Sequence, residues 1–251
     1  MISVKGLSVS FSGKSVLDGL DLDIHEGRTL VVLGRSGIGK SVLLKAILGL
    51  VDVQAGSVEI DGENVLAVPA SRARALRGRV GMLLQNGGLF DSMTVFDNIA
   101  FPLRYHKMAL ETEIHAQVER FASLVDLKDA LEVYPQELSG GMRRRAALAR
   151  AIIQKPKYLF YDEPSTGLDP TTSALVEILI RRVKEELGIT TVVVTHDLDL
   201  LKFLGEDVAL LSDGHIVAYE EITAALKPGS PIWEDFIIQR EKAHREHGYQ
   251  A

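Results

Sequence analysis

The chain has 251 residues, of which 46% are hydrophobic and 25% charged, as in an ordinary globular protein. Its formal net charge of -6 disfavours a broad nucleic-acid surface, and the absence of cysteine excludes disulfides, thiolate nucleophiles and cysteine-ligated zinc. No apolar run approaches the roughly 18 residues needed to span a bilayer, and the N-terminus does not have the pattern of a signal peptide. Any membrane role is therefore expected to act through a partner.

The first third of the chain is predicted to be rich in strands. Residues 2–24 are predicted to form strands, because apolar and polar side chains alternate at 2–4 and at 20–24. A short buried strand at 30–33 leads into a helix at 40–49 that ends at Gly49. Further strands are expected at 57–60 and 79–84.

The pattern then becomes mainly helical from about 94 to 153, with helices expected at 94–104, 111–125 and 140–153. Strand signals return at 158–161, 190–195, 207–211 and 215–219. Strands that alternate with helices predict a sheet with parallel strands and helical crossovers, into which the middle block is inserted.

An amphipathic helix is predicted between the strands at 158–161 and 190–195. Its expected apolar positions recur every four residues, and Gly188 closes it. These positions are Leu175, Leu179, Val183 and Leu187.

Residues 34–41 read Gly-Arg-Ser-Gly-Ile-Gly-Lys-Ser and lie between a predicted strand and a predicted helix, the setting of a phosphate-binding loop. Glycines let several N–H groups converge on an anion, and the helix adds its positive N-terminal end. Lys40 is expected to reach the β- and γ-phosphates, and Ser41 to offer its hydroxyl to Mg²⁺. The alternative is a glycine-rich helix start without a ligand. The predicted nucleotide contacts here are Gly34, Arg35, Ser36, Gly37, Ile38, Gly39, Lys40, Ser41 and Val42.

A second candidate motif is the apolar run 158–161, which is followed by Asp162 and Glu163. A carboxylate at the end of a buried strand next to a phosphate loop can hold Mg²⁺ or its water, which is the role predicted for Asp162. Glu163 is predicted to polarise the attacking water as a general base. The alternative is a solvated turn.

Residues 138–142, which include Ser139, Gly140 and Gly141, precede the helical run that starts at Arg143 and form a second potential anion site, with a plain helix cap as the alternative. Three consecutive arginines, 143–145, point in different directions on a helix. We therefore expect them to lie on a solvated or inter-subunit face rather than to bind nucleic acid.

The ordered set of motifs resembles the nucleotide-binding subunits of ABC transporters over nearly the full chain. Residues 34–41 resemble the Walker A loop, and 138–142 resemble the signature sequence. The other matches are Gln85 (Q-loop), Asp162 and Glu163 (Walker B and catalytic glutamate), 165–169 (D-loop), His196 (switch histidine) and Phe11 (adenine-stacking aromatic). The departures are Met142 for the usual Gln, Gly167 for Ala and Phe11 for Tyr.

This resemblance implies an α/β P-loop NTPase fold, with a mixed or parallel sheet, an N-terminal antiparallel β subdomain and a helical subdomain inserted at about 86–153. The ABC ATPase domain would span 1–227, followed by a charged tail at 228–251. The resemblance also implies ATP hydrolysis by a head-to-tail homodimer that is closed by two ATP molecules.

The resemblance further assigns roles to individual residues. Lys40, Gln85 and His196 would grip the γ-phosphate from one subunit, and Ser139 from the other. Glu163, His196, Gln85 and Lys40 are the predicted catalytic residues. The predicted Mg²⁺ ligands are Ser41, Gln85 and Asp162, and the remaining nucleotide contacts are Phe11, Ser139, Gly140, Gly141 and Asp169.

Residues 85–103 place apolar residues between polar ones, as expected of a surface that receives a permease, although ordinary helix packing would give the same pattern. Together with 140–151, this stretch most resembles the Mla (maintenance of lipid asymmetry) ATPases. That likeness implies a permease and an Mce-domain lipid-binding protein as partners, phospholipid as cargo, and a place on the cytoplasmic face of the bacterial inner membrane.

Three alternatives remain: the ATPase of an amino-acid or other solute importer, a soluble non-transport ABC ATPase, and a P-loop kinase or GTPase. The last is disfavoured because it would not need 138–142 and because no Asn-Lys-x-Asp motif is present. In the tail, Trp233, Phe236 and Ile237 are predicted to share a helical face that packs on an ATPase domain.

Overall fold

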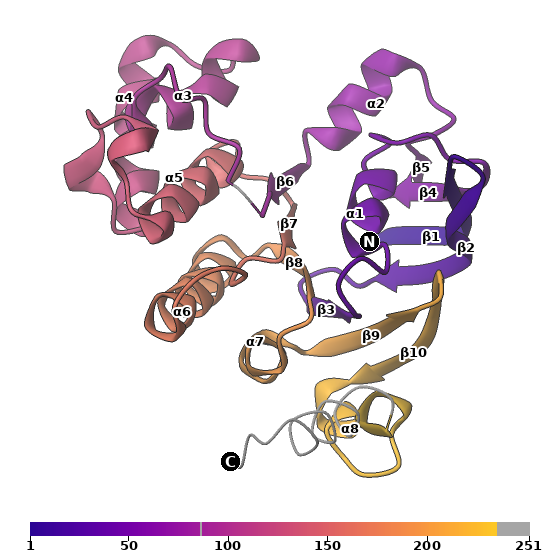
Figure 1. The fold of residues 1–251 in the computed structure, drawn as a ribbon. Helices are drawn as coiled ribbons and strands as arrows, with labels where there is room; N and C mark the ends of the chain where they lie inside the picture. Colours follow the sequence, from indigo (N-terminus) through magenta and orange to yellow (C-terminus); the bar gives the residue numbers. More distant parts are fainter. Residues whose placement is uncertain (86, 235–251) are drawn as a thin grey trace. The chain divides into compact units, whose positions relative to one another are not determined.

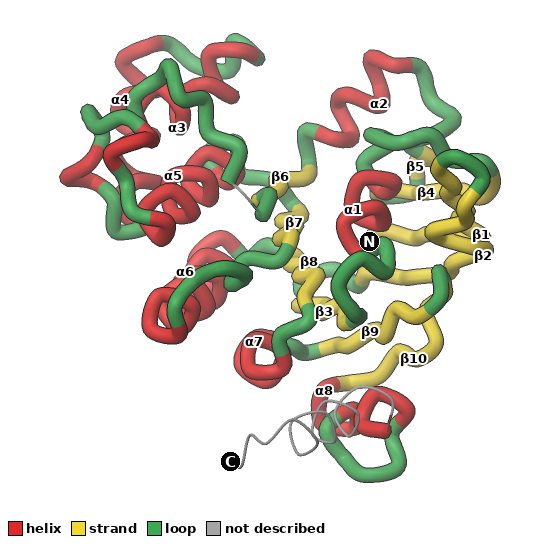
Figure 2. The backbone as a smooth tube through the Cα atoms, in the orientation of Figure 1, coloured by secondary structure: helices red, strands yellow, loops and turns green. Residues whose placement is uncertain are grey.

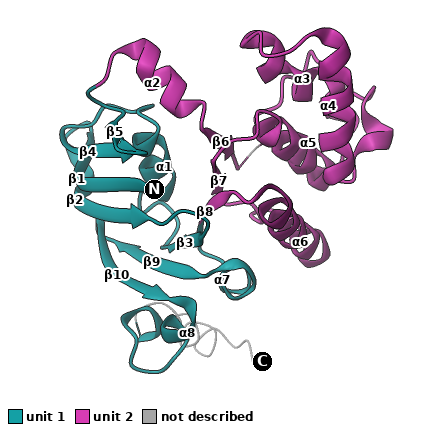
Figure 3. Ribbon diagram, turned by 180° about the vertical axis from the view of Figure 1, so that it is seen from behind, with its two compact units in different colours: residues 1–67, 194–251 teal, residues 68–193 magenta. Residues whose placement is uncertain are grey.

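The structure is a computed structural model of the chain and describes residues 1–85 and 87–234. The chain divides into two compact units, residues 1–67 with 194–251 and residues 68–193 (Figure 3). Figure 1 labels the helices and strands in chain order, and Figure 2 colours the same backbone by secondary structure.

The first unit contains an antiparallel sheet with the strand order β2-β1-β4-β5. Strand β1 pairs with β2 on one side and with β4 on the other. Alternate residues of β1, such as Ile2 and Val4, are fully buried. This sheet confirms the predicted N-terminal antiparallel β subdomain. Its strands are β1 (Ile2–Phe11), β2 (Lys14–Ile24), β4 (Ala55–Ile60) and β5 (Glu63–Asn64).

A second set of strands in this unit carries the phosphate loop. Strand β3 (Thr29–Leu33) pairs in parallel with β9 (Asp207–Ser212), which pairs antiparallel with β10 (His215–Glu221). Every residue of β3 is buried, as expected for a strand in a parallel sheet that is covered on both faces. The helices of the unit are α1 (Lys40–Ile47), α7 (Leu198–Leu204) and α8 (Ile222–Ala225).

The second unit combines buried strands with most of the helices. Strand β6 (Val80–Leu83) pairs in parallel with β7 (Tyr158–Asp162), and β8 (Thr190–Thr195) begins near the end of the unit. Parallel strands separated by helices confirm the predicted α/β class. The helices are α2 (Ala70–Arg77), α3 (Val95–Tyr105), α4 (Glu111–Leu124), α5 (Gly140–Ile152) and α6 (Pro170–Leu187), with short 3₁₀ turns at Lys128–Ala130 and Pro135–Glu137.

Helices α3, α4 and α5 pack together and account for the helical stretch predicted from 94 to 153. Arg104 on α3 donates to Asp97 at 2.7 Å and to Glu111 on α4 at 2.9 Å, which ties the first two helices together. These groups are exposed, so solvent screens each ion pair and its contribution to stability is small. The limits of a separate helical subdomain at about 86–153 stay a prediction.

Helix α6 differs from its predicted apolar stripe. Leu175 is 47% exposed, and the buried face is formed by Val176, Leu179, Ile180 and Val183. The prediction is therefore wrong at Leu175, because a strict four-residue spacing drifts around a helix of 3.6 residues per turn. Helices α2 and α7 were not predicted; α2 buries only Ala73 and Leu76, too few residues to make a stripe.

The described part of the tail packs on the first unit. Ile232 has no exposed surface, and the hydroxyl of Ser230 donates to Glu220 of β10 at 2.5 Å. The same hydroxyl accepts from the backbone N–H groups of Ile232 and Trp233. Phe236 and Ile237 lie outside the described residues. Among the described helices, none is both long and apolar enough to cross a membrane.

Candidate nucleotide site

The loop between β3 and α1 has the backbone geometry of an anion cradle. Gly37 and Gly39 have φ angles of +79° and +112°, which other residues rarely adopt. A Cβ at Gly34 would lie 2.9 Å from the carbonyl oxygen of Leu211, so this position also needs glycine. Helix α1 has no side-chain cap at Gly39 and no acidic residue in its first turn. Its N-terminal N–H groups are thus suited to a negatively charged ligand.

Lys40 places a cation inside this loop. Its side chain is 5% exposed, and Nζ donates to the carbonyl oxygens of Gly34 at 2.7 Å and Arg35 at 3.0 Å. These bonds fold the side chain back over residues 34–39. The ammonium group and the N–H groups at the start of α1 both carry positive charge, so the loop and Lys40 together fit a polyphosphate. Ser41, the predicted Mg²⁺ ligand, is half-buried at the start of α1.

The hairpin that carries Phe11 is fixed against the phosphate loop. Phe11 ends β1 and is 46% exposed, which leaves an aromatic face available for stacking. Strand β2 passes so close to the loop that a Cβ at Gly39 would lie 2.9 Å from Cγ1 of Val16. On the other side of the same strand segment, the N–H of Asp18 donates to the carbonyl of Gly214 at 3.0 Å. The adenine-stacking role of Phe11 stays a prediction.

His196 also belongs to the first unit and is exposed directly after β8. The residues on either side are held in place. The N–H of Asp197 donates to Oγ1 of Thr195 at 3.0 Å, and the Asp197 carboxylate caps α7 by accepting from the N–H of Asp199 at 2.9 Å. The backbone on either side of His196 is therefore held in place, while the role of His196 as a switch residue stays a prediction.

Gln85 lies in the second unit, two residues beyond the end of β6, and is exposed. The turn around it is closed by the N–H of Gly87, which donates to the carbonyl of Leu84 at 2.8 Å. Its position at a strand end agrees with the prediction, while its contact with phosphate and Mg²⁺ stays a prediction.

Asp162 and Glu163 are almost fully buried at the end of β7, with 5% and 8% exposure. Glu163 has a φ of +50°, an unfavourable value for a residue with a side chain and one that clusters at functional sites. The hydroxyl of Thr166 donates to Oε2 of Glu163 at 3.0 Å, and the Thr166 N–H donates to the Glu163 carbonyl. This geometry does not fit the alternative of a solvated turn.

Ser139 caps helix α5, because its hydroxyl accepts from the N–H of Met142 at 3.3 Å. The helix cap predicted as an alternative is therefore present. Ser139 and Gly140 are exposed, so the cap leaves the start of the helix accessible to an anion. Gly141 lies against α6, since a Cβ there would be 2.9 Å from Cγ2 of Thr172. Binding of phosphate by these residues stays a prediction.

Asp169 caps helix α6 by accepting from the N–H of Thr172 at 3.0 Å. Hydrogen bonding to Thr172 lowers the pKa of the Asp169 carboxyl below its usual value. The charged form at the N-terminus of α6 is therefore favoured near neutral pH.

The arginine triplet is expected on a solvated or inter-subunit face, and its central residue is not fully solvated. Arg144 is half-buried and donates from Nη2 to the carbonyl of Thr166, in the turn that follows Glu163. Burial lowers the pKa of its guanidinium. Arg143, by contrast, is exposed. The central arginine therefore joins helix α5 to the turn that holds the predicted base.

Each unit holds part of the predicted site. The first unit contains Phe11, residues 34–42 and His196. The second contains Gln85, Ser139, Gly140, Gly141, Asp162, Glu163 and Asp169. The assembly of both groups around one nucleotide stays a prediction.

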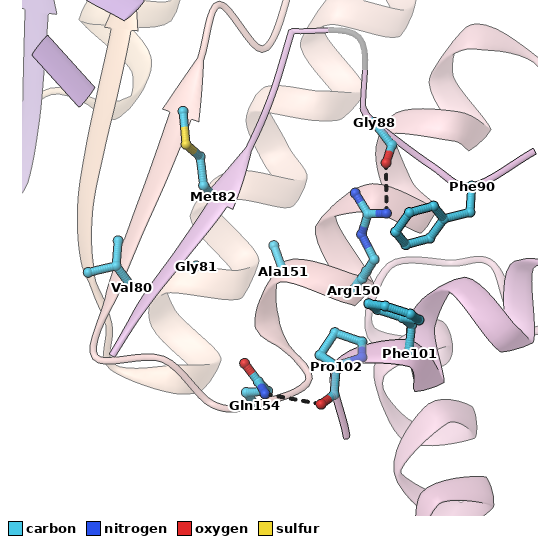
Figure 4. A pocket seen from close by; sticks show the side chains of 10 residues that line it. All are labelled: Val80, Gly81, Met82, Gly88, Phe90, Phe101, Pro102, Arg150, Ala151 and Gln154. Atoms are coloured by element: carbon cyan, nitrogen blue, oxygen red, sulfur yellow. Dashed lines mark hydrogen bonds between the residues drawn. The ribbon is translucent and has the colours of Figure 1, made fainter. Parts of the chain in front are cut away.

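The second unit also contains a cavity of about 310 Å³, shown in Figure 4. Two glycines and an alanine line the cavity, and Phe90 and Phe101 form part of its apolar wall. Arg150 and Gln154 contribute the polar groups of the lining. The lining comes from β6, from residues 88–102 and from the end of α5: Val80, Gly81, Met82, Gly88, Phe90, Phe101, Pro102, Arg150, Ala151 and Gln154. Part of its lining, Gly88, Phe90, Phe101 and Pro102, thus belongs to the stretch predicted to receive a permease.

Asn98 organises this stretch, a role that the sequence pattern does not indicate. Its amide is fully buried and donates to the carbonyls of Phe90, Met93 and Thr94, while Oδ1 accepts from the Phe90 N–H. An asparagine in an amphipathic helix looks like an ordinary surface residue, so only its burial reveals this role.

The phosphate loop, the buried carboxylates at the end of β7 and the glycine-rich start of α5 define an ATP-hydrolysing domain of the ABC class. The family model described as ABC transporter matches residues 17–166. The chain belongs to this family, binds ATP and is an ATPase.

Three named relatives align with most of the chain. MlaF, the intermembrane phospholipid transport system ATP-binding protein of Escherichia coli (strain K12), is 37% identical over 94% of this chain and 88% of its own length. The methionine import ATP-binding protein MetN of Carboxydothermus hydrogenoformans is 38% identical, with 94% and 71% covered. The probable ribonucleotide transport ATP-binding protein mkl of Mycobacterium leprae is 37% identical, with 95% and 69% covered.

Among solved structures, a dimeric ATP-binding cassette in a post-hydrolysis state with ADP and Pi superposes with a TM-score of 0.80. It is 28% identical, and the match covers 88% of this chain and 99% of that one. The similarity extends the family assignment to the three-dimensional fold.

Proposed function

We propose that this chain is the ATPase subunit of a membrane transporter and acts as a homodimer that closes around two ATP molecules. Two observations support the dimer: the chain has one phosphate loop and one signature sequence, and the related cassette of known structure is dimeric. In such a dimer, the phosphate loop of one subunit and the signature of the other face the same nucleotide.

The proposed roles follow from the chemistry of each group. Lys40 and the N–H groups of the loop neutralise the β- and γ-phosphates, and Ser139 contacts the γ-phosphate from the partner subunit. Glu163 accepts a proton from the water that attacks the γ-phosphorus, and Gln85 and His196 position that water and the phosphate. Like-charged products then favour opening of the dimer, so ATP binding and hydrolysis alternate two states of the assembly.

Ser41, Gln85 and Asp162 supply hydroxyl, amide and carboxylate oxygens, a donor set that suits Mg²⁺. When bound there, Mg²⁺ would neutralise charge on the phosphates. Asp162 is 5% exposed at the end of β7, where a carboxylate beside a phosphate loop can hold Mg²⁺ or its water.

Two substitutions test these roles. Glu163→Gln should keep ATP binding, abolish most turnover and prolong the closed dimer, as seen by size-exclusion chromatography with ATP. Lys40→Ala should weaken nucleotide binding and lower turnover together. Normal turnover in Glu163→Gln would remove Glu163 as the base, and normal turnover in Lys40→Ala would refute the assignment of that residue.

We further propose phospholipid as the cargo, with a permease and an Mce-domain lipid-binding protein as partners, on the cytoplasmic face of the bacterial inner membrane. The likeness to MlaF over nearly the whole chain carries this proposal. The likeness to MetN supports a second candidate, the import of an amino acid or another small solute.

The permease is proposed to dock on the surface around residues 85–103. Leu84, Phe90 and Tyr105 are exposed there, and the cavity of about 310 Å³ opens beside Phe90. An exposed group of large apolar side chains beside a hollow is typical of a binding surface.

The deciding experiment is a pull-down of tagged chain from native membranes in gentle detergent, with mass spectrometry of the proteins and lipids that co-purify. A permease with an Mce-domain protein and phospholipid supports the lipid proposal. A permease with a solute-binding protein keeps the ATPase mechanism and replaces the cargo. Recovery of soluble partners alone, or failure to sediment with membranes, favours an ABC ATPase outside transport.

A further inference from the structure

Arg150, near the end of helix α5, makes a bidentate contact with the backbone just beyond Gln85, which is called the fork below. Its Nη1 donates to the carbonyl of Gly88 at 2.8 Å, and its Nη2 donates to the carbonyl of Gly87 at 2.9 Å. Figure 4 shows the guanidinium pointing at Gly88. A planar fork on two successive carbonyls fixes both the position and the orientation of the backbone.

The contacted segment is built to lie against α5. Gly87 and Gly88 have φ angles of +72° and +62°, and Gly87 is buried. A Cβ at Gly87 would already touch the Cβ of Ala147 at 3.4 Å. Closely packed glycines with left-handed backbones let the two carbonyls turn toward Arg150. The fork therefore holds a segment that approaches the helix closely.

The guanidinium is itself held in place by an aromatic ring. Its central carbon lies 5.6 Å from the centroid of the Phe90 ring, within the range of a cation–π contact. Phe90 is in turn anchored by two hydrogen bonds between its backbone and Asn98. Arg150, Gly88 and Phe90 all line the cavity, so a segment seated in that cavity touches the group that holds the backbone next to Gln85.

We propose that Arg150 is a positioning residue for Gln85. The fork joins the backbone just after Gln85 to helix α5, which begins at Ser139, and so sets where the Gln85 side chain lies relative to the signature sequence. This inference rests on the proposed role of Gln85 in hydrolysis. The sequence alone did not indicate it, since Arg150 resembles the other arginines of α5.

A double-mutant cycle tests the inference on the purified full chain. Arg150→Lys keeps the charge but loses the fork, and it should lower ATP turnover by about tenfold to a hundredfold, the range for a displacement approaching 1 Å. In a Gln85→Ala background, the same substitution should change turnover by less than about twofold, because residues that act through one another are not additive. The matched control is Arg145→Lys on the same helix, whose guanidinium makes a contact of 3.4 Å with the carbonyl of Asp126 and which should keep wild-type turnover.

The outcomes separate this inference from the proposed function. If Arg150→Lys lowers turnover by the same factor in both backgrounds, or leaves it unchanged, Arg150 does not position Gln85, whereas the role of Gln85 stands. If Gln85→Ala has wild-type turnover, the proposed role of Gln85 fails and this inference fails with it.

A second measurement does not depend on residual activity. Hydrogen–deuterium exchange should become faster in a peptide covering 84–90 in Arg150→Lys and stay unchanged in Arg145→Lys. The inference would be overturned if exchange became faster throughout the chain, or if exchange at 84–90 did not change. If Arg150→Lys does not fold, Phe90→Leu weakens the same group from its other side. It should lower turnover by a smaller factor, and that loss should disappear in the Gln85→Ala background.

Discussion

Replacing Gly141 by alanine should lower ATP turnover by pushing the signature sequence away from helix α6. The added Cβ would lie 2.9 Å from Cγ2 of Thr172, whereas carbon atoms in contact lie about 3.5–4.0 Å apart. The contact must therefore open by about 0.6 Å or more. Thr172 is β-branched and stiff, so part of the movement falls on the start of helix α5. Since a 1 Å displacement can cost a hundredfold, we expect a loss of about tenfold.

A second substitution separates this cause from general damage. Thr172→Ser removes the methyl group that would clash and keeps the hydroxyl, so Gly141→Ala with Thr172→Ser should recover turnover to within about threefold of wild type. Thr172→Ser alone should be normal. Gly140→Ala should cost less than Gly141→Ala, because its Cβ would lie 3.6 Å from Cδ2 of Leu168, an ordinary contact.

The assay is steady-state ATP turnover by the full chain, with a thermal melt of each variant beside it. Alanine is a better helix former than glycine by up to about 1 kcal/mol, which offsets part of the cost of the clash, so Gly141→Ala should lose far more activity than stability. The reasoning fails if Gly141→Ala turns over normally, or if Thr172→Ser gives no recovery while both proteins melt like wild type.

Three further predictions concern stability. Asn98→Ala removes four hydrogen bonds that hold the loop before α3. It should lower the free energy of unfolding by about 2–4 kcal/mol and the Tm by roughly 5–12 °C. A Tm within about 2 °C of wild type would contradict this expectation. Ile232→Ala creates a void under the start of the tail and should cost about 2 kcal/mol in urea unfolding, whereas an exposed tail would show no loss. Asp169 has a lowered pKa in the folded chain, so its carboxylate stabilises α6 above the ordinary value of 3.8 and less as the pH falls through the folded value. The difference in Tm between wild type and Asp169→Ala should therefore shrink below pH 3.8, and a constant difference would argue against the cap.

The prediction of the local elements succeeded where periodicity and turn residues agreed. Strand β3 is a short apolar run, and helix α5 begins with two glycines directly after a serine, so each could be placed from a few neighbouring residues. The predicted stripe on α6 was wrong at Leu175, because four-residue spacing alone does not say which side of a helix the rest of the unit covers. Helix α2 was not predicted, because few of its residues are apolar.

The candidate site divides in the same way. The chemistry of the phosphate loop is local: glycines, a lysine and a helix start within a few residues determine that an anion can bind there. The sequence does not predict that Glu163 is buried, that its backbone is left-handed or that it accepts a hydrogen bond from Thr166. The strand that ends at Asp162 is buried at every residue, and the turn after it places Glu163 next to that buried strand.

The sequence by itself determined the class of this protein: an ATP-hydrolysing domain whose motifs occur in a recognisable order, each made of residues adjacent in the chain. Only the tertiary structure decided which polar side chains hold those motifs in place. Arg144 reaches the turn after Glu163, Arg150 reaches Gly87 and Gly88, and Asn98 ties the loop at Phe90. Arg144 and Arg150 act across long separations in the chain, where packing rather than local preference decides which arginine or asparagine is buried and which faces solvent.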